Sequence, residues 1–222
     1  MPDDLSPQHR FGELSLATFV DRLTSSDPVP GGGSASAVAA SLAAGLVAMV
    51  AALSDRPKYV DHAALHGRAQ EVGRRLATRF LQLADEDAEA YGTFAAAAKL
   101  PRETDEERVT RSAALAAAAR KAAEVPLATV EACLELVSMA ESLVGRSNVN
   151  ASSDLYVATL LGEAAARGAA ENVLVNLPSI GDEGLAGKMT SSVMSLLDSI
   201  EELAAAAQAM VRDGATREPL PE

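Results

Sequence analysis

The sequence predicts an all-α fold: an up-and-down bundle of about six helices around one long, buried helix rich in Ala and Gly. Aromatic residues make up 3% of the 222 residues and Trp is absent. Alanine instead occurs in runs, as in Ala95–Ala98 and Ala116–Ala119; it favours helices, whereas strands favour β-branched and aromatic side chains. No linker rich in Pro, Gly or Ser divides the chain, so we expect residues 1–222 to form a single domain.

Two helices are expected in the first quarter of the chain. Residues 12–25 space their apolar side chains as an amphipathic helix does. The stretch from Gly31 to Leu53 carries no charge and has the length of a membrane span, but it is rich in small residues and lacks a basic flank. A helix that is apolar all round is normally buried. We therefore expect it inside the bundle or across a subunit interface, in a homodimer that does not enter a membrane.

Four further helices are expected over residues 58–98, 104–144, 154–177 and 185–211. Pro57 suits the first turn of the first of these. Thr104 and Glu107 have the spacing of a capping box, which starts the second, and Pro126 should kink it. The polar segment 145–154 predicts a loop, and the tail GATREPLPE is expected to fray.

Composition disfavours several classes of function. The formal net charge of −12 argues against nucleic-acid binding, which depends on clustered Lys and Arg. Cys133 has no second cysteine to pair with and lies among apolar residues, so we expect a buried structural thiol. The N-terminus lacks the pattern of a signal peptide, which together with the single cysteine predicts a cytoplasmic protein.

Metal and cofactor chemistry is not expected. The three histidines are not arranged in a ligand cluster. His62 and His66, four residues apart, would form at most a weak two-ligand site, and we expect a solvated pair instead. No metal ion and no other cofactor is predicted.

Two features are candidates for a functional site. The glycines Gly31–Gly33 let a ligand approach the backbone, and the N–H groups at a helix start favour an anion; a tight turn that only starts the helix is the alternative. In the acidic stretch LADEDAEAY, Asp87 falls near the apolar side of its helix, where a carboxylate is costly unless it is paired or functional. Asp154, at the exit of the polar loop, either caps the next helix or belongs to a site.

Several motifs resemble the cyclodeaminase/cyclohydrolase family of folate enzymes. In chain order they are PVPGGGSASAVAASLAAGLVAMVAAL, DEDAEAY, KLPRETDEER, AAEVPL, NASSDLYVATLL and NVLVNLPSIGDE. That family includes the cyclodeaminase half of formiminotransferase-cyclodeaminase and the stand-alone methenyltetrahydrofolate cyclohydrolases. The likeness runs from about residue 14 to residue 203, which we take as the core of the domain. It implies an all-helical, dimeric protein whose folate site lies where helices meet.

The resemblance also implies which residues form that site. Asp87 and Asp154 match its acidic positions, and we expect them to flank the folate, one as proton shuttle and the other bonded to the pterin. Relatives have a Thr-x-Gly-Lys/Arg stretch after the glycine helix, which LSDRPKY lacks. Either Arg56 or Lys58, together with Lys99, is expected to pair with the glutamate tail. The remaining substrate-binding positions are Gly31, Gly32, Gly33, Ser34, Asn148 and Ser153.

Three functions follow from the resemblance. The expected one is hydrolysis of 5,10-methenyltetrahydrofolate to 10-formyltetrahydrofolate, because no formiminotransferase domain stands ahead of Met1 to supply a formimino substrate. The first alternative is a cyclodeaminase that closes 5-formiminotetrahydrofolate to the methenyl compound and releases ammonia. The second is a folate-binding helical dimer without catalysis, which the shortened LSDRPKY segment favours and the matched aspartates oppose.

Overall fold

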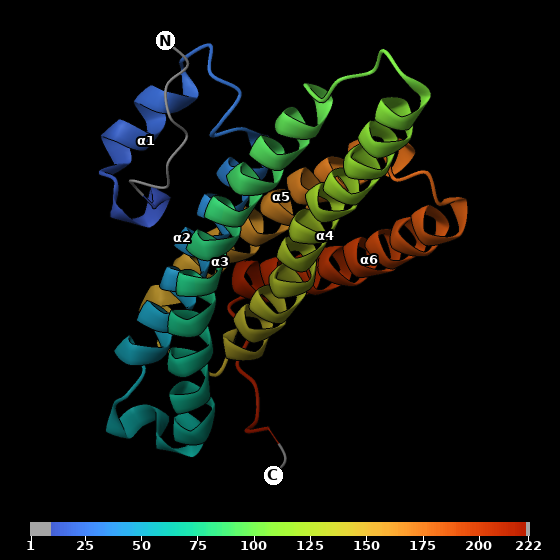
Figure 1. Ribbon diagram of the computed structural model, residues 1–222. Helices are drawn as coiled ribbons and strands as arrows, with labels where there is room; N and C mark the ends of the chain where they lie inside the picture. Colours follow the sequence, from blue (N-terminus) through green and yellow to red (C-terminus); the bar gives the residue numbers. More distant parts are fainter. Residues whose placement is uncertain (1–9, 221–222) are drawn as a thin grey trace.

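The computed structural model describes residues 10–220, and within them every regular element is a helix (Figure 1). The α-helices are α1 (Leu16–Leu23), α2 (Gly32–Leu53), α3 (Ala63–Ala98), α4 (Asp105–Leu143), α5 (Ser152–Asn176) and α6 (Glu183–Asp213). The short 3-10 helices are η1 (Phe11–Glu13), η2 (Pro57–His62), η3 (Val149–Ala151) and η4 (Leu177–Ser179). The predicted all-α class is confirmed.

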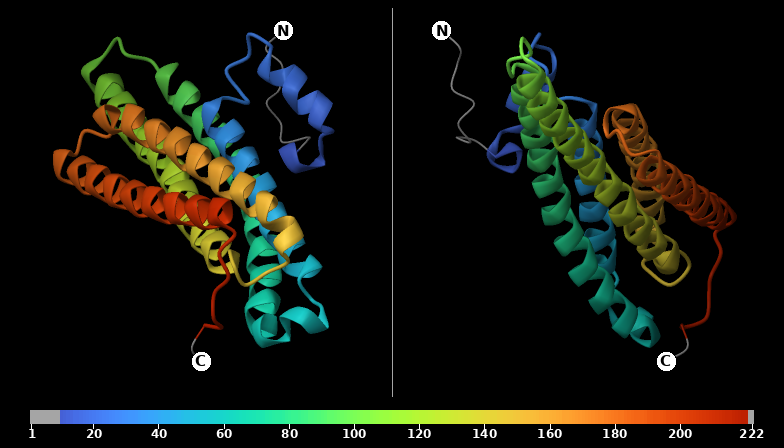
Figure 2. Two further views of the ribbon diagram at one scale, coloured as in Figure 1. Left: turned by 180° about the vertical axis from the view of Figure 1, so that it is seen from behind. Right: turned by 45° about the vertical axis from the view of Figure 1, so that its right-hand side comes forward.

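Helices α2 to α5 form an up-and-down bundle. Helix α2 packs against α3 and α5, and α4 packs against the same two helices. The connections are short, so that neighbours along the chain run antiparallel. Helix α6 crosses the bundle obliquely and packs on α4 and α5 (Figure 2). Helix α1 lies to one side of the bundle (Figure 1), and the Phe11 N–H before it donates to Asp85 Oδ1 of α3 at 2.8 Å.

Helix α2 is buried on one side only. Its small residues allow a close approach to α3 at Gly73, where an added Cβ would lie 2.8 Å from the Ala44 carbonyl oxygen and 2.9 Å from the Ala48 Cβ. On the opposite side Leu42, Met49 and Leu53 are 55%, 39% and 38% exposed. By length and composition α2 could span a membrane. A single chain therefore covers about half of the circumference of α2. This excludes the alternative of a helix buried entirely inside one bundle, and the alternative of a subunit interface stays a prediction.

The structure differs from the expectations at the start of α3 and in the C-terminal tail. The expected helix over residues 58–98 begins at Ala63, because Tyr59 has a non-helical backbone (φ −118°, ψ 21°) and closes a 3-10 turn. The capping box at Thr104 is confirmed, and α4 continues through Pro126; the kink expected there stays a prediction. The tail is anchored: the Arg217 guanidinium donates to Glu141 Oε1 at 2.8 Å and the Arg217 N–H to the Gly145 carbonyl at 3.0 Å.

The core consists mainly of alanine, with a few large side chains spaced along it. The largest that are fully buried include Phe80, Leu76, Leu83 and Leu136. Cys133 is fully buried among them, and burial raises the pKa of its thiol to about 12. The predicted structural thiol is confirmed, because such a group is not ionised near neutral pH.

Candidate functional site

The start of α2 and the middle of α3 meet at Asp87. The Ser34 hydroxyl lies 3.0 Å from Asp87 Oδ2 and 3.1 Å from the Ala84 carbonyl oxygen. Gly31, the N-cap of α2, has no side chain to cap the helix, so the first N–H groups of α2 lack the usual partner. Asp87 brings a carboxylate to this end of α2 from the neighbouring helix, and the helix dipole favours negative charge there.

Gly33 makes this contact possible. A Cβ built on Gly33 would lie 2.2 Å from Asp87 Oδ1 and 2.6 Å from both Cγ and Oδ2, so any side chain here would displace the carboxyl group. The glycine therefore does more than start a helix: it leaves the space in which the carboxyl group rests against the backbone. Of the predicted site residues, Gly31, Gly32, Gly33, Ser34 and Asp87 are brought together here.

Asp87 is chemically suited to exchange a proton. Burial raises the pKa of its carboxyl group, and hydrogen bonds from the hydroxyl and backbone of Ser34 oppose that shift only in part. A hydroxyl is both donor and acceptor. Ser34 can thus donate to an ionised Asp87, or accept from a protonated Asp87 while donating to the Ala84 carbonyl. The pair accommodates both protonation states without rearranging the helices, as a general acid–base residue requires.

Helix α5 adds an amide that sequence reasoning missed. An added Cβ on Gly32 would lie 3.7 Å from Asn172 Nδ2, and Asn172 donates to the Gly168 carbonyl at 2.8 Å. One turn further, Asn176 donates to the Ala122 carbonyl of α4 at 3.1 Å. The sequence signal that could have indicated this site is a pair of asparagines one turn apart at the end of a largely apolar helix. Both are half-buried in the structure.

The other predicted residues lie at the opposite end of α2. Arg56 lines a cavity of about 410 Å³ together with Ser54, Tyr59 and His66. Lys58 is exposed, and its ammonium group lies 5.3 Å from the centre of the Tyr59 ring.

The Asn148 loop closes this same end of the bundle. Asn148 is buried, its N–H donates to the Ser54 hydroxyl at 2.8 Å, its side-chain oxygen accepts from the Asn150 N–H, and its side-chain nitrogen lies 3.4 Å from the Leu53 carbonyl. Ser153 is exposed and Asp154 half-buried in the first turn of α5. Asn148 therefore joins the loop to the end of α2, and its side chain already has protein partners.

One chain does not bring Asp87 and Asp154 together. Helix α2 has 22 residues and is about 30 Å long at 1.5 Å per residue. Asp87 lies at its start, and the loop before Asp154 lies at its end. Lys99, the C-cap of α3, lies on the far side of Asp87, about 18 Å further along that helix. The expectation that both aspartates flank one folate is not met within a single chain.

The histidine pair differs from the expectation. His66 is 2% exposed, not solvated, and its Nε2 lies 2.8 Å from the Arg146 carbonyl oxygen. A carbonyl only accepts, so Nε2 of His66 carries a proton in this contact. The part of the chain from residue 10 to residue 220 contains no group of three His, Cys, Asp or Glu side chains placed to hold a metal ion.

Comparison with known proteins identifies the family. The model of the family described as formiminotransferase-cyclodeaminase matches residues 15–195. The chain belongs to this family. It is 36% identical, over 84% of its length, to the methenyltetrahydrofolate cyclohydrolase of Methylorubrum extorquens, of which it covers 90%. The resemblance inferred from the motifs is confirmed.

Other members of the formiminotransferase-cyclodeaminase family match about nine-tenths of the chain. Rat formimidoyltransferase-cyclodeaminase is 33% identical over 91% of this chain, which spans 38% of the rat protein. The crystal structure of formiminotetrahydrofolate cyclodeaminase from Thermotoga maritima aligns with a TM-score of 0.83 and 28% identity, over 91% of this chain and 98% of that one. Fold and family therefore agree.

Proposed function

We propose that this member of the formiminotransferase-cyclodeaminase family hydrolyses 5,10-methenyltetrahydrofolate to 10-formyltetrahydrofolate. The observation that carries the proposal is Asp87, a carboxyl group with a raised pKa resting on the Gly33 backbone at a helix start. The relative of which this chain covers 90% is named a methenyltetrahydrofolate cyclohydrolase. The chain spans 38% of the length of rat formimidoyltransferase-cyclodeaminase.

The reaction needs one group that moves protons. Water attacks the carbon between N5 and N10, and Asp87 as carboxylate accepts a proton from that water. The protonated Asp87 then donates to N5 as the bond between N5 and the carbon breaks. The hydroxyl proton of the tetrahedral carbon leaves for solvent as the formyl C=O forms on N10. Such general acid–base help contributes about 10²- to 10⁴-fold in rate.

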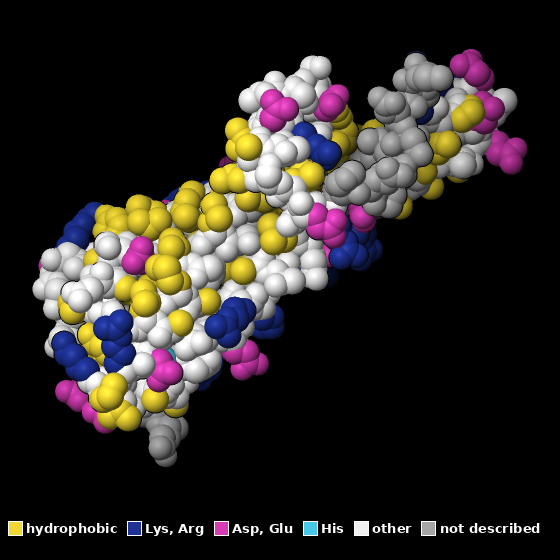
Figure 3. Space-filling model, turned by 90° about the vertical axis from the view of Figure 1, so that its left-hand side faces the viewer, with side chains coloured by type: hydrophobic (Ala, Val, Ile, Leu, Met, Phe, Trp, Pro, Cys, Tyr) yellow, Lys and Arg dark blue, Asp and Glu magenta, His cyan; other side chains and the backbone are white. Residues whose placement is uncertain are grey.

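A second copy of the chain would complete the predicted site. The exposed side of α2 carries Leu42 near its middle and Met49 and Leu53 beyond it. Figure 3 shows hydrophobic side chains along the side of the molecule on which α2 lies. A two-fold axis near Leu42 would place two α2 helices antiparallel, in a self-complementary interface. The start of each would then lie beside the end of the other, and Asp87 of one copy would face Asp154 of its partner.

Cyclodeamination is the second candidate. The solved structure with a TM-score of 0.83 is that of a formiminotetrahydrofolate cyclodeaminase, and both reactions pass through a tetrahedral carbon between N5 and N10. In that case N10 attacks the formimino carbon and Asp87 accepts the proton that N10 loses. Asp87 then returns this proton to the amino group, which leaves as ammonia as the methenyl C=N bond forms.

The cytoplasmic location of the protein stays a prediction.

The test follows both substrates with the purified protein. We expect 5,10-methenyltetrahydrofolate to lose its near-ultraviolet absorbance band faster than in buffer, and Asp87→Asn to abolish the acceleration while keeping the helical circular dichroism spectrum. Growth of the same band from 5-formiminotetrahydrofolate, with ammonia release, would instead identify a cyclodeaminase. If neither substrate reacts faster than in buffer, the non-catalytic folate-binding dimer becomes the favoured function.

A further inference from the structure

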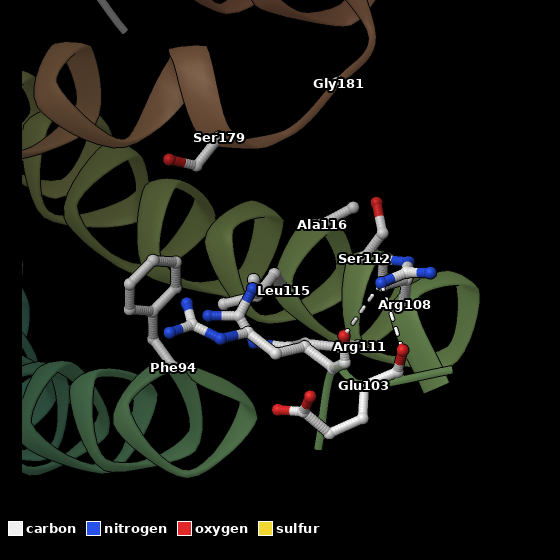
Figure 4. A pocket seen from close by; sticks show the side chains of 10 residues that line it. Phe94, Glu103, Arg108, Arg111, Ser112, Leu115, Ala116, Ser179 and Gly181 are labelled. Atoms are coloured by element: carbon white, nitrogen blue, oxygen red, sulfur yellow. Dashed lines mark hydrogen bonds between the residues drawn. The ribbon is translucent and has the colours of Figure 1, made fainter. Parts of the chain in front are cut away.

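A cavity of about 640 Å³ opens where α3, α4 and the segment after α5 meet. Figure 4 shows Phe94 of α3 and Leu115, Arg108 and Arg111 of α4 around it, with Ser179 beyond. Its charged lining residues are Arg102, Glu103, Arg108 and Arg111. A pocket with an excess of guanidinium groups is unexpected on a chain with a net charge of −12.

Two of the three guanidinium groups, those of Arg108 and Arg111, are hydrogen-bonded to the protein, and not all three are neutralised. Arg111 donates through Nε and Nη2 to the Ala98 carbonyl, at 3.4 and 3.1 Å, and a carbonyl orients a guanidinium without cancelling its charge. Arg102 has no side-chain hydrogen bond or ion pair with any residue between 10 and 220. Arg108 is paired with Asp105 at 2.7 Å. Arg102 and Arg111 are therefore available for a ligand with carboxylates, which guanidinium groups bind through two parallel hydrogen bonds.

The cavity also has an apolar wall. Phe94, Leu115 and Ala116 line it beside the arginines. An inorganic anion would leave this wall uncovered. The lining matches a ligand that joins an aromatic or other apolar group to carboxylates.

The position of the cavity relates it to Asp87. Phe94 is two turns beyond Asp87 on the same face of α3, about 10 Å away along the helix axis. Helix α2 begins at the level of Asp87, so it does not cover this part of α3. A ligand in the cavity can extend along α3 toward Asp87.

We propose that this pocket binds the aminobenzoyl-glutamate half of the folate, with its carboxylates on Arg102 and Arg111 and its reacting end directed to Asp87. The ring of the aminobenzoyl group would lie against the Phe94 side chain, which lines the pocket. The proposal rests on the proposed folate function and assigns the tail to a pocket formed within one chain. Within one chain it places the tail far from Arg56 and Lys58, for which, together with Lys99, the sequence predicted that role.

The test measures binding of the tail apart from turnover. p-Aminobenzoyl-triglutamate, p-aminobenzoate and inorganic phosphate are titrated separately into the full-length protein by calorimetry. Three proteins are compared: wild type, Arg102→Gln and the matched control Arg120→Gln, which removes the same charge from an exposed position of α4. We expect the triglutamate to bind, Arg102→Gln to weaken it about ten-fold, and Arg120→Gln to leave it unchanged. With methenyltetrahydrofolate triglutamate as substrate, Arg102→Gln should raise KM and not lower kcat.

Each outcome decides the proposal. Absence of triglutamate binding, equal loss in both variants, or phosphate binding as tightly as the triglutamate would overturn it, the last by showing a general anion site. Triglutamate binding that depends on Arg102, in a protein that turns over neither folate, would support the pocket and refute the proposed activity. Turnover of methenyltetrahydrofolate with a KM that Arg102→Gln does not change would support the proposed activity and refute the pocket.

Discussion

Replacing Gly33 by alanine tests whether the position of the Asp87 carboxyl group matters for catalysis. The added Cβ would lie 2.2 Å from Asp87 Oδ1, whereas ordinary contact begins at 3.4 Å, so the carboxyl group must retreat by about 1 Å. A misplacement of about 1 Å at a reacting group costs about 10²-fold in rate. We expect kcat for methenyltetrahydrofolate hydrolysis to fall by about that factor.

The same substitution should hardly change stability, which separates it from a folding defect. Alanine in place of glycine stabilises a helix by about 0.5–1 kcal/mol, and weakening the Ser34 hydrogen bond to Asp87 costs about 1 kcal/mol. The two nearly cancel, so the thermal unfolding midpoint measured by circular dichroism should stay close to wild type. Gly187→Ala on α6, where an added Cβ meets nothing within 4 Å, is the matched control and should keep full activity. Wild-type kcat in Gly33→Ala would falsify the assignment of Asp87 as the proton shuttle.

Four further predictions concern pH, assembly, packing and reactivity. Burial raises the pKa of Asp87, so the folded state favours its protonated form and the free energy of unfolding falls as pH rises through that pKa. Asp87→Asn should therefore have a higher unfolding midpoint than wild type at pH 8, and the two midpoints should coincide near pH 3.8. A difference that persists at pH 3.8 would contradict this prediction. Leu42→Asp should shift the protein from dimer to monomer in sedimentation velocity, and an unchanged sedimentation coefficient would count against the proposed interface. Gly73→Ala places a Cβ 2.8 Å from the Ala44 carbonyl oxygen, and since backbone cannot yield it should lower the free energy of unfolding by about 1–3 kcal/mol in urea titration. Cys133, buried and with a pKa of about 12, should react with iodoacetamide in urea and hardly at all in the native protein, as mass spectrometry can show.

The fold was largely predictable because its signals are local. Alanine runs, the capping box at Thr104 and the uncharged stretch 28–54 depend on neighbours within a few residues, and each gave a helix in the right place. The errors arose where distant residues decide. Tyr59 leaves the helical conformation at a place where its hydroxyl accepts from the Val149 N–H, and Gly214, with a φ of 62°, turns the tail back onto α4.

The site was predictable only in part. Asp87 could be found because a carboxylate on the apolar side of a helix needs a reason to be there. Its contact with Gly33 joins residues on separate helices, and nothing local signals it. Asp154 was assigned to the same site by family resemblance, which is silent on which chain supplies each residue. The cluster of Arg102, Arg108 and Arg111 around Phe94 could not be predicted from the sequence, because the fold brings α3 and α4 together there. Locally their segment shows only the capping box that starts α4.

The alanine core also sets which stabilising changes an engineer can make. Where helices pack backbone against backbone, as at Gly73, Ala44 and Ala48, filling the interior with larger side chains would push the helices apart. Thermostabilising substitutions must then be sought outside the core, at helix ends, in the loops and on exposed glycines such as Gly67 and Gly187, which have open space around them. Directed evolution of this scaffold should accumulate its gains at its periphery.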